Sequence, residues 1–267
     1  MDLAKKIKKI EALKLKLSGS GSNQSWDQAF IEEVKTSFTY YSNKIEGNAI
    51  TFGQTIQLLK DFVTPKNAST GECLDILNHQ RVLDEVFEEY QATTISESSM
   101  LRIHRELMKN PDQWADSIHY DPGKYKIHEN LTIRMNGKIH RYAEPGDVKK
   151  LLVDLIKSTN QRILDLDAGN SADHILNIAT DFHYHFLNDI HPFGDGNGRL
   201  ARIYMNLILL KAGYPPIFIK PVDKNDYMNR FEEEESNPGA MLDFMADQLL
   251  KSLKEKQKFF EQAKRTE

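Results

Sequence analysis

The stretch His191–Arg202 holds the side chains best suited to chemistry in this chain. It reads HPFGDGNGRLAR and supplies, in order, His191, Asp195, the run Gly196-Asn197-Gly198, and then Arg199 and Arg202. Histidine has a pKa near neutral pH and can take a proton from an attacking hydroxyl. A carboxylate can hold a Mg²⁺ ion that bridges phosphates, and arginines offer planar forks of donors that match phosphate oxygens. The order indicates an enzyme that acts on a nucleoside triphosphate.

Two expected helices place these residues around one loop. Ser171–Asp189 has apolar residues near helical spacing, with Ser171 as its N-cap, and Pro192 stops the helix from continuing. A second apolar run follows Gly198 and ends near Gly213. The glycine-rich loop therefore leads into a helix N-terminus, where unpaired N–H groups and the helix dipole favour an anion.

Each of these residues, taken singly, has a simpler explanation. A histidine at a helix end is usually structural, paired glycines usually mark a turn, and two arginines on one helix face usually point to solvent. Phe193 is expected to anchor the loop in the core whatever the function. All of these residues in this order favour the nucleotide site.

HPFGDGNGRLAR resembles the signature of Fic-domain proteins, His-Pro-Phe-x-(Asp/Glu)-Gly-Asn-Gly-Arg-x-x-Arg, and fills every fixed position. The resemblance implies a mainly α fold, a Fic-type helical bundle with one β-hairpin flap, and transfer of AMP from ATP to a protein hydroxyl. It makes His191 the general base and Asp195 the Mg²⁺ ligand. It assigns Gly196, Asn197 and Gly198 to the anion hole, and Arg199 and Arg202 to the β- and γ-phosphates. Gly198 favours adenylyl transfer, because the phosphorylating Doc branch has lysine there.

A second match lies upstream, in Ser42-Asn43-Lys44-Ile45-Glu46-Gly47. It resembles the inhibitory motif (Ser/Thr)-x-x-x-Glu-(Gly/Asn) of self-restrained Fic proteins, so Ser42, Glu46 and Gly47 are implied to be inhibitory. In that family the glutamate pairs with the second motif arginine, here Arg202. A carboxylate would then compete with a phosphate for one guanidinium. The alternative is an exposed glutamate before a glycine that ends a helix.

A β-hairpin is expected between these two motifs. Gly123–Lys126, Leu131–Met135 and Lys138–Tyr142 flank the dipeptide Asn136-Gly137, which is the strongest short hairpin signal. In Fic proteins such a flap clamps the target segment, and arginine is more usual where Lys126 stands. A plain surface hairpin is the alternative.

Tyr227 lies where Fic proteins often carry an aromatic residue on the adenine side of the nucleotide. It is either a neighbour of the adenine or a core tyrosine.

Composition limits the remaining choices. The net charge of −4 and the pI of about 6.2 argue against general nucleic-acid binding. The single cysteine, Cys73, excludes an internal disulfide and fits a reducing compartment. No apolar run reaches the length of a membrane span and no signal peptide is evident, so we expect a cytoplasmic protein. His183 and His185 are two apart on a helix and face different directions, which is unfavourable for zinc.

The chain is expected to divide into a lysine-rich amphipathic leader with a Ser/Gly linker at 1–25, an N-terminal inhibitory helix region at 26–64, a Fic core at 65–255 with the flap near 123–142, and a C-terminal helical tail at 256–267. The apolar face of the leader could dock on the body or on a second subunit, touch an anionic surface, or be loosely ordered. Fic proteins that carry the inhibitory motif before the Fic core are often dimers, so a homodimer is one expected assembly.

The sequence thus predicts an autoinhibited protein adenylyltransferase (AMPylator) that uses ATP and Mg²⁺ and modifies Ser, Thr or Tyr of an unidentified protein. Two alternatives stay open. The same site could remove AMP from a modified protein, with Glu46 positioning water. The chain could also be a nucleotide-sensing regulatory protein with little turnover, although binding alone needs no base such as His191.

Overall fold

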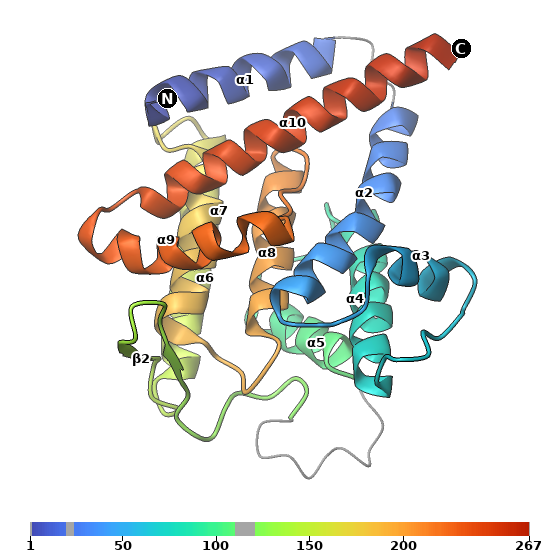
Figure 1. The fold of residues 1–267 in the computed structure, drawn as a ribbon. Coiled ribbons are helices and arrows are strands. Elements are labelled where there is room, and N and C mark those ends of the chain that lie inside the picture. Colours follow the sequence, from blue (N-terminus) through green and yellow to red (C-terminus); the bar gives the residue numbers. More distant parts are fainter. Residues whose placement is uncertain (1, 20–23, 110–120, 267) are drawn as a thin grey trace.

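The computed structural model describes residues 2–19, 24–109 and 121–266, and in these ranges the chain is mainly helical, with one short hairpin at its edge (Figure 1). The helices are α1 (Leu3–Gly19), α2 (Gln24–Ile45), α3 (Phe52–Lys60), α4 (Thr70–Glu88), α5 (Glu97–Leu107), α6 (Val148–Asp167), α7 (Ile175–Tyr184), the π-helix η2 (His185–Ile190), α8 (Asn197–Lys211), the 3-10 turn η3 (Pro221–Asp223), α9 (Lys224–Ser236) and α10 (Ala240–Thr266). The expected mainly α fold with one hairpin is confirmed.

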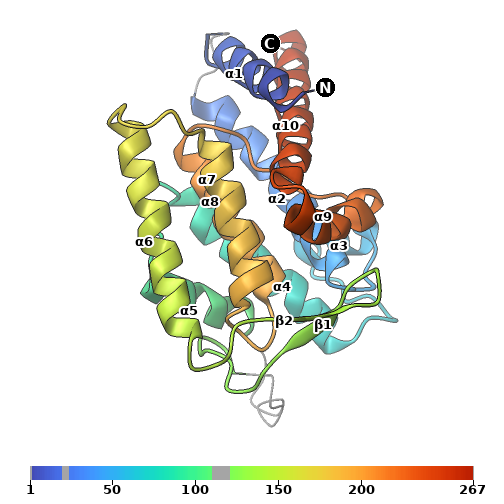
Figure 2. The same ribbon diagram turned by 90° about the vertical axis from the view of Figure 1, so that its left-hand side faces the viewer.

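Helix α8 forms the centre of the molecule. Every residue from Arg199 to Leu210 is buried, and α2, α4, α5 and α7 all pack against it. A helix that is enclosed on all sides belongs to the core rather than to the surface. Figure 2 shows α7 beside it, with α6 as the next layer outward. The N-terminus of α8, where the glycine-rich loop enters, is therefore fixed by the core.

Helix α7 begins later than the sequence suggests, because Ser171 does not cap it. The hydroxyl of Ser171 accepts the backbone N–H of Asp173 at 3.0 Å, within a turn that precedes the helix. His174 is the N-cap instead, and its Nδ1 accepts the N–H of Leu176 at 3.1 Å. The last turn also departs from the expected α-helix, since residues 185–190 form η2.

The expected hairpin is present, with shorter strands. β1 (Leu131–Ile133) pairs antiparallel with β2 (Ile139–Arg141), and Thr132 lies opposite His140. Gly137 in the connecting turn has φ 80°, which glycine adopts without steric cost. We call residues 123–142 the flap. The residue that follows it, Ala143, donates its N–H to the carbonyl of Asp189 at 2.8 Å, so the flap is tied to η2.

The segment after α2 is held by α4. Gly47 has φ 100° and lets the chain turn away from the end of α2. Asn48 Nδ2 donates to the carbonyl of Glu72 at 2.9 Å, and the Glu72 carboxylate accepts the N–H of Ala49 at 2.8 Å. A small apolar cluster beside these contacts contains Ile50, Leu58, Cys73 and Ile76. Glu46 is therefore positioned by tertiary contacts on its C-terminal side.

Helix α1 is docked on the body along α10 (Figures 1 and 2). Ile10 and Leu17 are buried, as the amphipathic pattern predicts. Lys6 is buried as well, and its Nζ lies 2.7 Å from Asp243 and 2.6 Å from Asp247. None of the helices in residues 2–19, 24–109 and 121–266 combines the length and apolar character that a membrane crossing requires.

Replacing Ile10 with alanine tests whether α1 is part of the cooperative fold. Ile10 is fully buried, so its truncation should lower the free energy of unfolding by about 2–4 kcal/mol. Leu15→Ala is the matched control, because Leu15 is 75% exposed and its loss should cost less than about 0.5 kcal/mol. Urea unfolding measures both. Equal and negligible effects would mean that α1 behaves as a detachable leader.

Candidate active site

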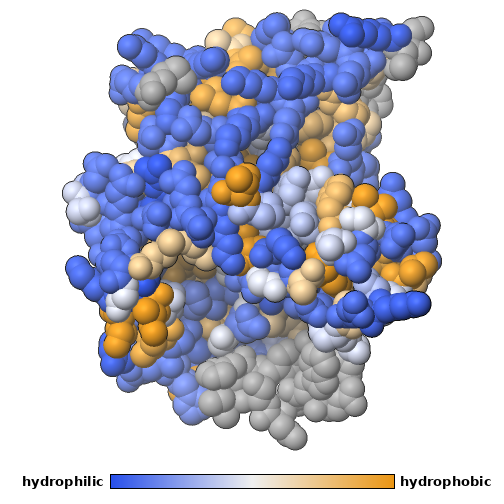
Figure 3. Space-filling model, viewed as in Figure 1, coloured by the Kyte–Doolittle hydropathy of each residue, from blue (hydrophilic) through white to orange (hydrophobic). Residues whose placement is uncertain are grey.

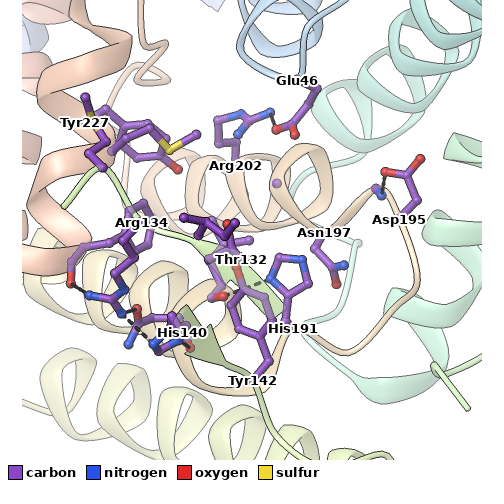
Figure 4. Close-up of a pocket in the computed structure, with 18 of the residues that line it drawn as sticks. Glu46, Thr132, Arg134, His140, Tyr142, His191, Asp195, Asn197, Arg202 and Tyr227 are labelled. Carbon is purple, nitrogen blue, oxygen red and sulfur yellow. Dashed lines mark hydrogen bonds and ion pairs between the residues drawn. The ribbon is translucent and has the colours of Figure 1, made fainter. Parts of the chain in front are cut away.

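Seven residues of the His191–Arg202 stretch border a cavity of about 330 Å³ (Figure 4). The flap covers one side, and the start of α9 covers another. The end of α2 reaches in from a third direction. The lining includes Glu46, Thr132, Arg134, His140, Tyr142, His191, Asp195, Gly196, Asn197, Gly198, Arg202, Tyr227 and Phe231. A cavity of this size with a few converging polar groups is typical of a small-molecule site.

His191 is aimed into the cavity by unusual backbone geometry. The π-helix η2 ends beside it, and His191 itself is in the left-handed region with φ 47°. Its Nδ1 lies 3.0 Å from the carbonyl of Leu187. A carbonyl can only accept, so Nδ1 carries the proton and Nε2 keeps a free lone pair. The ring stacks on Tyr142 with centroids 4.0 Å apart.

Burial lowers the pKa of His191 to about 4, and the nearby positive charge of Lys126 acts in the same direction. The carboxylates of Glu46 and Asp195 and the bond to Leu187 oppose this shift. At neutral pH the imidazole is therefore uncharged. A neutral imidazole with a free Nε2 is the form that accepts a proton.

The glycine-rich loop opens the N-terminus of α8 towards the cavity. Gly196 is the N-cap residue and has φ 77°. A Cβ at Gly198 would collide with Glu46 and would stand 3.0 Å from Arg202 Nη1. The side chain of Asn197 does not point freely at an anion, because it exchanges two hydrogen bonds with the backbone of Phe193, at 3.0 and 2.8 Å. Anion contacts here would come from backbone N–H groups.

Arg202 is held by the segment that the second sequence match singled out. Its Nη2 donates to Glu46 Oε1 at 2.6 Å and to the carbonyl of Ser42 at 2.9 Å. Its Nε donates to Ser42 Oγ at 3.0 Å. The guanidinium is 3% exposed, whereas the Glu46 side chain is 38% exposed and lines the cavity. Glu46 and Arg202, which the family resemblance pairs, are thus in direct contact, as Figure 4 shows.

A family model described as the Fic/DOC family matches residues 94–209, a range that includes α5, the flap, α7 and the His191–Arg202 loop. This chain belongs to the Fic family. It is 31% identical over 208 residues to "Protein adenylyltransferase Fic" of Nematostella vectensis, covering 74% of this chain and 42% of that protein. It is 28% identical to the protein of the same name in Culex quinquefasciatus, covering 85% and 42%. The chain thus spans about two-fifths of the length of these relatives.

Solved structures agree with this fold. A Fic domain containing signaling protein from Bacteroides thetaiotaomicron matches with a TM-score of 0.80 and 26% identity, over 95% of this chain and 96% of that chain. Fic-1 from C. elegans matches with a TM-score of 0.77 and 20% identity, over 99% and 74%. At that identity the second match speaks for the fold alone.

The first arginine of the Fic signature, Arg199, does not line the cavity. Its Nη1 lies 2.5 Å from Asp75 of α4, and its Nη2 donates to Met108 Sδ at 3.3 Å. Burial raises the pKa of Asp75, while the Arg199 charge lowers it. The two signature arginines therefore meet different carboxylates. Binding of phosphate by Arg199 stays a prediction and requires the guanidinium to leave Asp75.

Asp195 stands at the cavity with its side chain 65% exposed. Within the described part of the chain, no group of three or more His, Cys, Asp or Glu residues converges in the manner of a metal cage. A Mg²⁺ ion commonly takes one or two carboxylates and completes its shell with water and substrate phosphates, and its binding by Asp195 stays a prediction. The Fic signature and this exposure both make Asp195 the candidate ligand.

Phe193 anchors the His191–Arg202 loop in the core, as expected, and is fully buried. It stacks on His104 of α5, with ring centroids 3.8 Å apart and planes 10° apart. His104 Nε2 donates to the carbonyl of Asp195 at 2.9 Å, and Nδ1 accepts the N–H of Gly123 at 2.8 Å. No local sequence signal points to this role of His104, because its partners Asp195 and Gly123 lie far along the chain.

The remaining polar wall comes from the flap and α9. Arg134 donates to Asn188 at 2.8 Å, contacts His140 at 2.8 Å, and pairs with Glu235 of α9 at 2.7 Å. Tyr227 is a core tyrosine, since it is 1% exposed, and it also lines the cavity; its hydroxyl bonds His183 at 2.9 Å. Its position beside the adenine stays a prediction. Figure 3 shows apolar side chains gathered where the flap lies in Figure 1. In the flap strands, Ile133 and Ile139 are 70% and 62% exposed.

Proposed function

We propose that this chain is an autoinhibited protein adenylyltransferase, which transfers AMP from ATP to a Ser, Thr or Tyr hydroxyl of another protein. The observation that carries the proposal is His191, a neutral imidazole that lines a cavity beside a helix N-terminus and whose Nε2 keeps its lone pair. The relatives named protein adenylyltransferase support it. The core would be residues 65–255, preceded by the inhibitory region at 26–64.

The chemistry follows from these positions. The target hydroxyl gives its proton to His191 Nε2 while its oxygen bonds the α-phosphorus. The bond between the α-phosphorus and the bridging oxygen to the β-phosphorus breaks, and pyrophosphate leaves. The N–H groups of Gly196–Gly198 and the guanidinium of Arg202 balance the phosphate charge. Mg²⁺ on Asp195 would supply further charge neutralisation when bound. The exposed strands of the flap would hold the target segment by main-chain pairing.

Glu46 would restrain this reaction. While its carboxylate occupies the Arg202 guanidinium, a γ-phosphate cannot bind there, and the carboxylate repels the triphosphate. Gly198 favours adenylyl over phosphoryl transfer, because the phosphorylating Doc branch has lysine at this position. A side chain here would enter the space next to Glu46 and Arg202.

The label position in ATP tests the reaction type. Glu46→Gly protein incubated with Mg²⁺ and a cell lysate should transfer label from the α-phosphate of ATP to protein, and none from the γ-phosphate. Pyrophosphate should appear in equal amount. Label from the γ-phosphate would instead identify a kinase. No label from either position, with ATP binding intact, would refute the transferase and favour a nucleotide-sensing protein.

Removal of AMP is a second candidate, favoured by the position of Glu46. Its half-exposed carboxylate borders the same cavity as His191, so it could orient a water molecule towards an adenylylated side chain. Wild-type protein would then release AMP from a target modified beforehand by the Glu46→Gly variant. A wild type that leaves the modified target unchanged would exclude this activity.

A further inference from the structure

The turn that carries His191 needs outside support. The π-helix η2 stops at Ile190, His191 has φ 47°, and Pro192 follows. A left-handed conformation is unfavourable for a residue other than glycine, and proline offers no N–H to a local hydrogen bond. Such a turn persists only where its surroundings hold it.

Lys126 of the flap supplies much of this support. Its backbone N–H donates to the carbonyl of Pro192 at 2.9 Å, and its Nζ donates to the carbonyl of Ile190 at 3.2 Å. These are the carbonyls on either side of His191. Nζ also donates to Asn130 Oδ1 at 2.6 Å, and Asn130 Nδ2 donates to the carbonyl of Phe193 at 3.2 Å. One flap lysine and its asparagine partner thus bind the carbonyls of Ile190, Pro192 and Phe193, the first at the end of η2 and the other two in the signature loop.

The charge of Lys126 is unusual for its position. The residue is 7% exposed, and within the described residues no carboxylate lies within 4.0 Å of its Nζ. Burial lowers the pKa of Lys126 to about 8, against the attraction of Glu144. A buried cation without a carboxylate partner costs free energy, and a methionine would fill the same space at lower cost. Stability of the fold therefore does not explain why a positive charge stands at this position.

The surroundings of His191 provide that reason. Lys126 Nζ lies 5.8 Å from the centroid of the Tyr142 ring, and Tyr142 stacks on His191. The other charged groups that act on the imidazole are Glu46 and Asp195, and both would stabilise an imidazolium. Lys126 is the nearby charged group that acts on the pKa of His191 in the opposite direction. Without it, the pull of these two carboxylates would be less opposed and the pKa of His191 would rise, while burial would remain the main cause of its low value.

We propose that Lys126 is a positioning residue for His191: its hydrogen bonds fix the turn that carries the base, and its buried charge opposes a second positive charge on the imidazole. The part of this proposal that concerns catalysis rests on the proposed function. The effect on the histidine itself does not, because it concerns the structure and protonation of His191 with no substrate bound.

The test compares Lys126→Met with Lys126→Arg, both in the Glu46→Gly protein. Lys126→Met should lower the transfer rate at saturating ATP by about ten-fold or more, with the KM for ATP changed less than about two-fold. The pH at which ¹⁵N NMR shows half-protonation of His191 should rise by at least about half a unit. Lys126→Arg keeps a charged donor and should stay near the parent in both measurements. Lys124→Met is the matched control, since the Lys124 side chain is 71% exposed.

Lys126→Gln separates the two roles and serves if the methionine variant does not fold. It keeps an N–H donor without the charge, so the NMR midpoint should rise while Nδ1 remains the protonated nitrogen. An unchanged midpoint in both Lys126→Met and Lys126→Gln, or a shift equal to that of Lys124→Met, would overturn the inference. Absence of transfer in the Glu46→Gly parent would refute the proposed function, whereas the NMR midpoints would still decide the role of Lys126.

Discussion

Replacing Glu46 with glycine is expected to raise the rate of adenylyl transfer by about 30- to 100-fold. Arg202 would exchange a carboxylate for a phosphate, and a charge-assisted hydrogen bond of this kind is worth about 2–3 kcal/mol. That free energy corresponds to the expected change in rate. The substitution also removes a negative charge from a cavity that must accept a triphosphate. Transfer of label from the α-phosphate of ATP, followed over time, measures the effect.

The same substitution should change stability in a way that depends on nucleotide. Arg202 is buried, and without Glu46 its guanidinium loses a carboxylate partner while its two hydrogen bonds to Ser42 remain. The variant should therefore melt at a lower temperature than the wild type when no nucleotide is present. Mg²⁺ and ATP should raise its melting temperature more than that of the wild type, because bound phosphate replaces the lost carboxylate.

Glu46→Gln is the matched control for this prediction. The amide keeps the length of the side chain and can still accept from Arg202, but it carries no charge. Its rate should lie between those of the wild type and Glu46→Gly. If all three proteins bind ATP equally by calorimetry and transfer AMP at equal rates, the contact between Glu46 and Arg202 is structural rather than inhibitory.

The parts of the molecule that could be predicted from sequence are those with a local signal. The Asn136-Gly137 dipeptide fixes a turn by its own backbone preferences, and the amphipathic pattern around Ile10 places a buried face on α1. The sequence also brings His191, Asp195 and Gly198 to one loop because they are neighbours in the chain. Glu46 was connected with Arg202 only through resemblance to a family, since nothing local links residues 156 apart.

The parts that could not be predicted depend on packing between distant elements. His104 bonds a carbonyl 91 residues away, and Asp75 pairs with an arginine 124 residues away. Apolar spacing along 175–190 predicts an α-helix throughout, and the six residues of the π-helix η2 show no separate signal in that pattern. Spacing places Arg199 and Arg202 on one helix face, but the carboxylates that meet them come from α4 and from the end of α2.

Replacing His191 with alanine in the Glu46→Gly protein is expected to lower transfer by at least about 100-fold, because a positioned general base contributes about 10²- to 10⁴-fold. ATP affinity should change little, since the phosphate contacts come from Arg202 and the N-terminus of α8. His185→Ala is the matched control: its ring is half-exposed, pairs with Asp189 and does not line the cavity. Transfer that survives His191→Ala at the parental rate would require a different base.

The pH dependence of transfer by the wild type tests the same assignment, and its sign follows from the lowered pKa of His191. The reaction needs the unprotonated imidazole, and burial lowers the pKa of His191 to about 4. The rate should therefore be flat from about pH 6 to pH 8 and fall only as the pH drops towards that pKa, where the base gains a proton. In the Glu46→Gly background the decline should begin at still lower pH, since the glutamate no longer favours the imidazolium. A decline centred near pH 6.5 would mean that His191 is solvated rather than buried in the active protein.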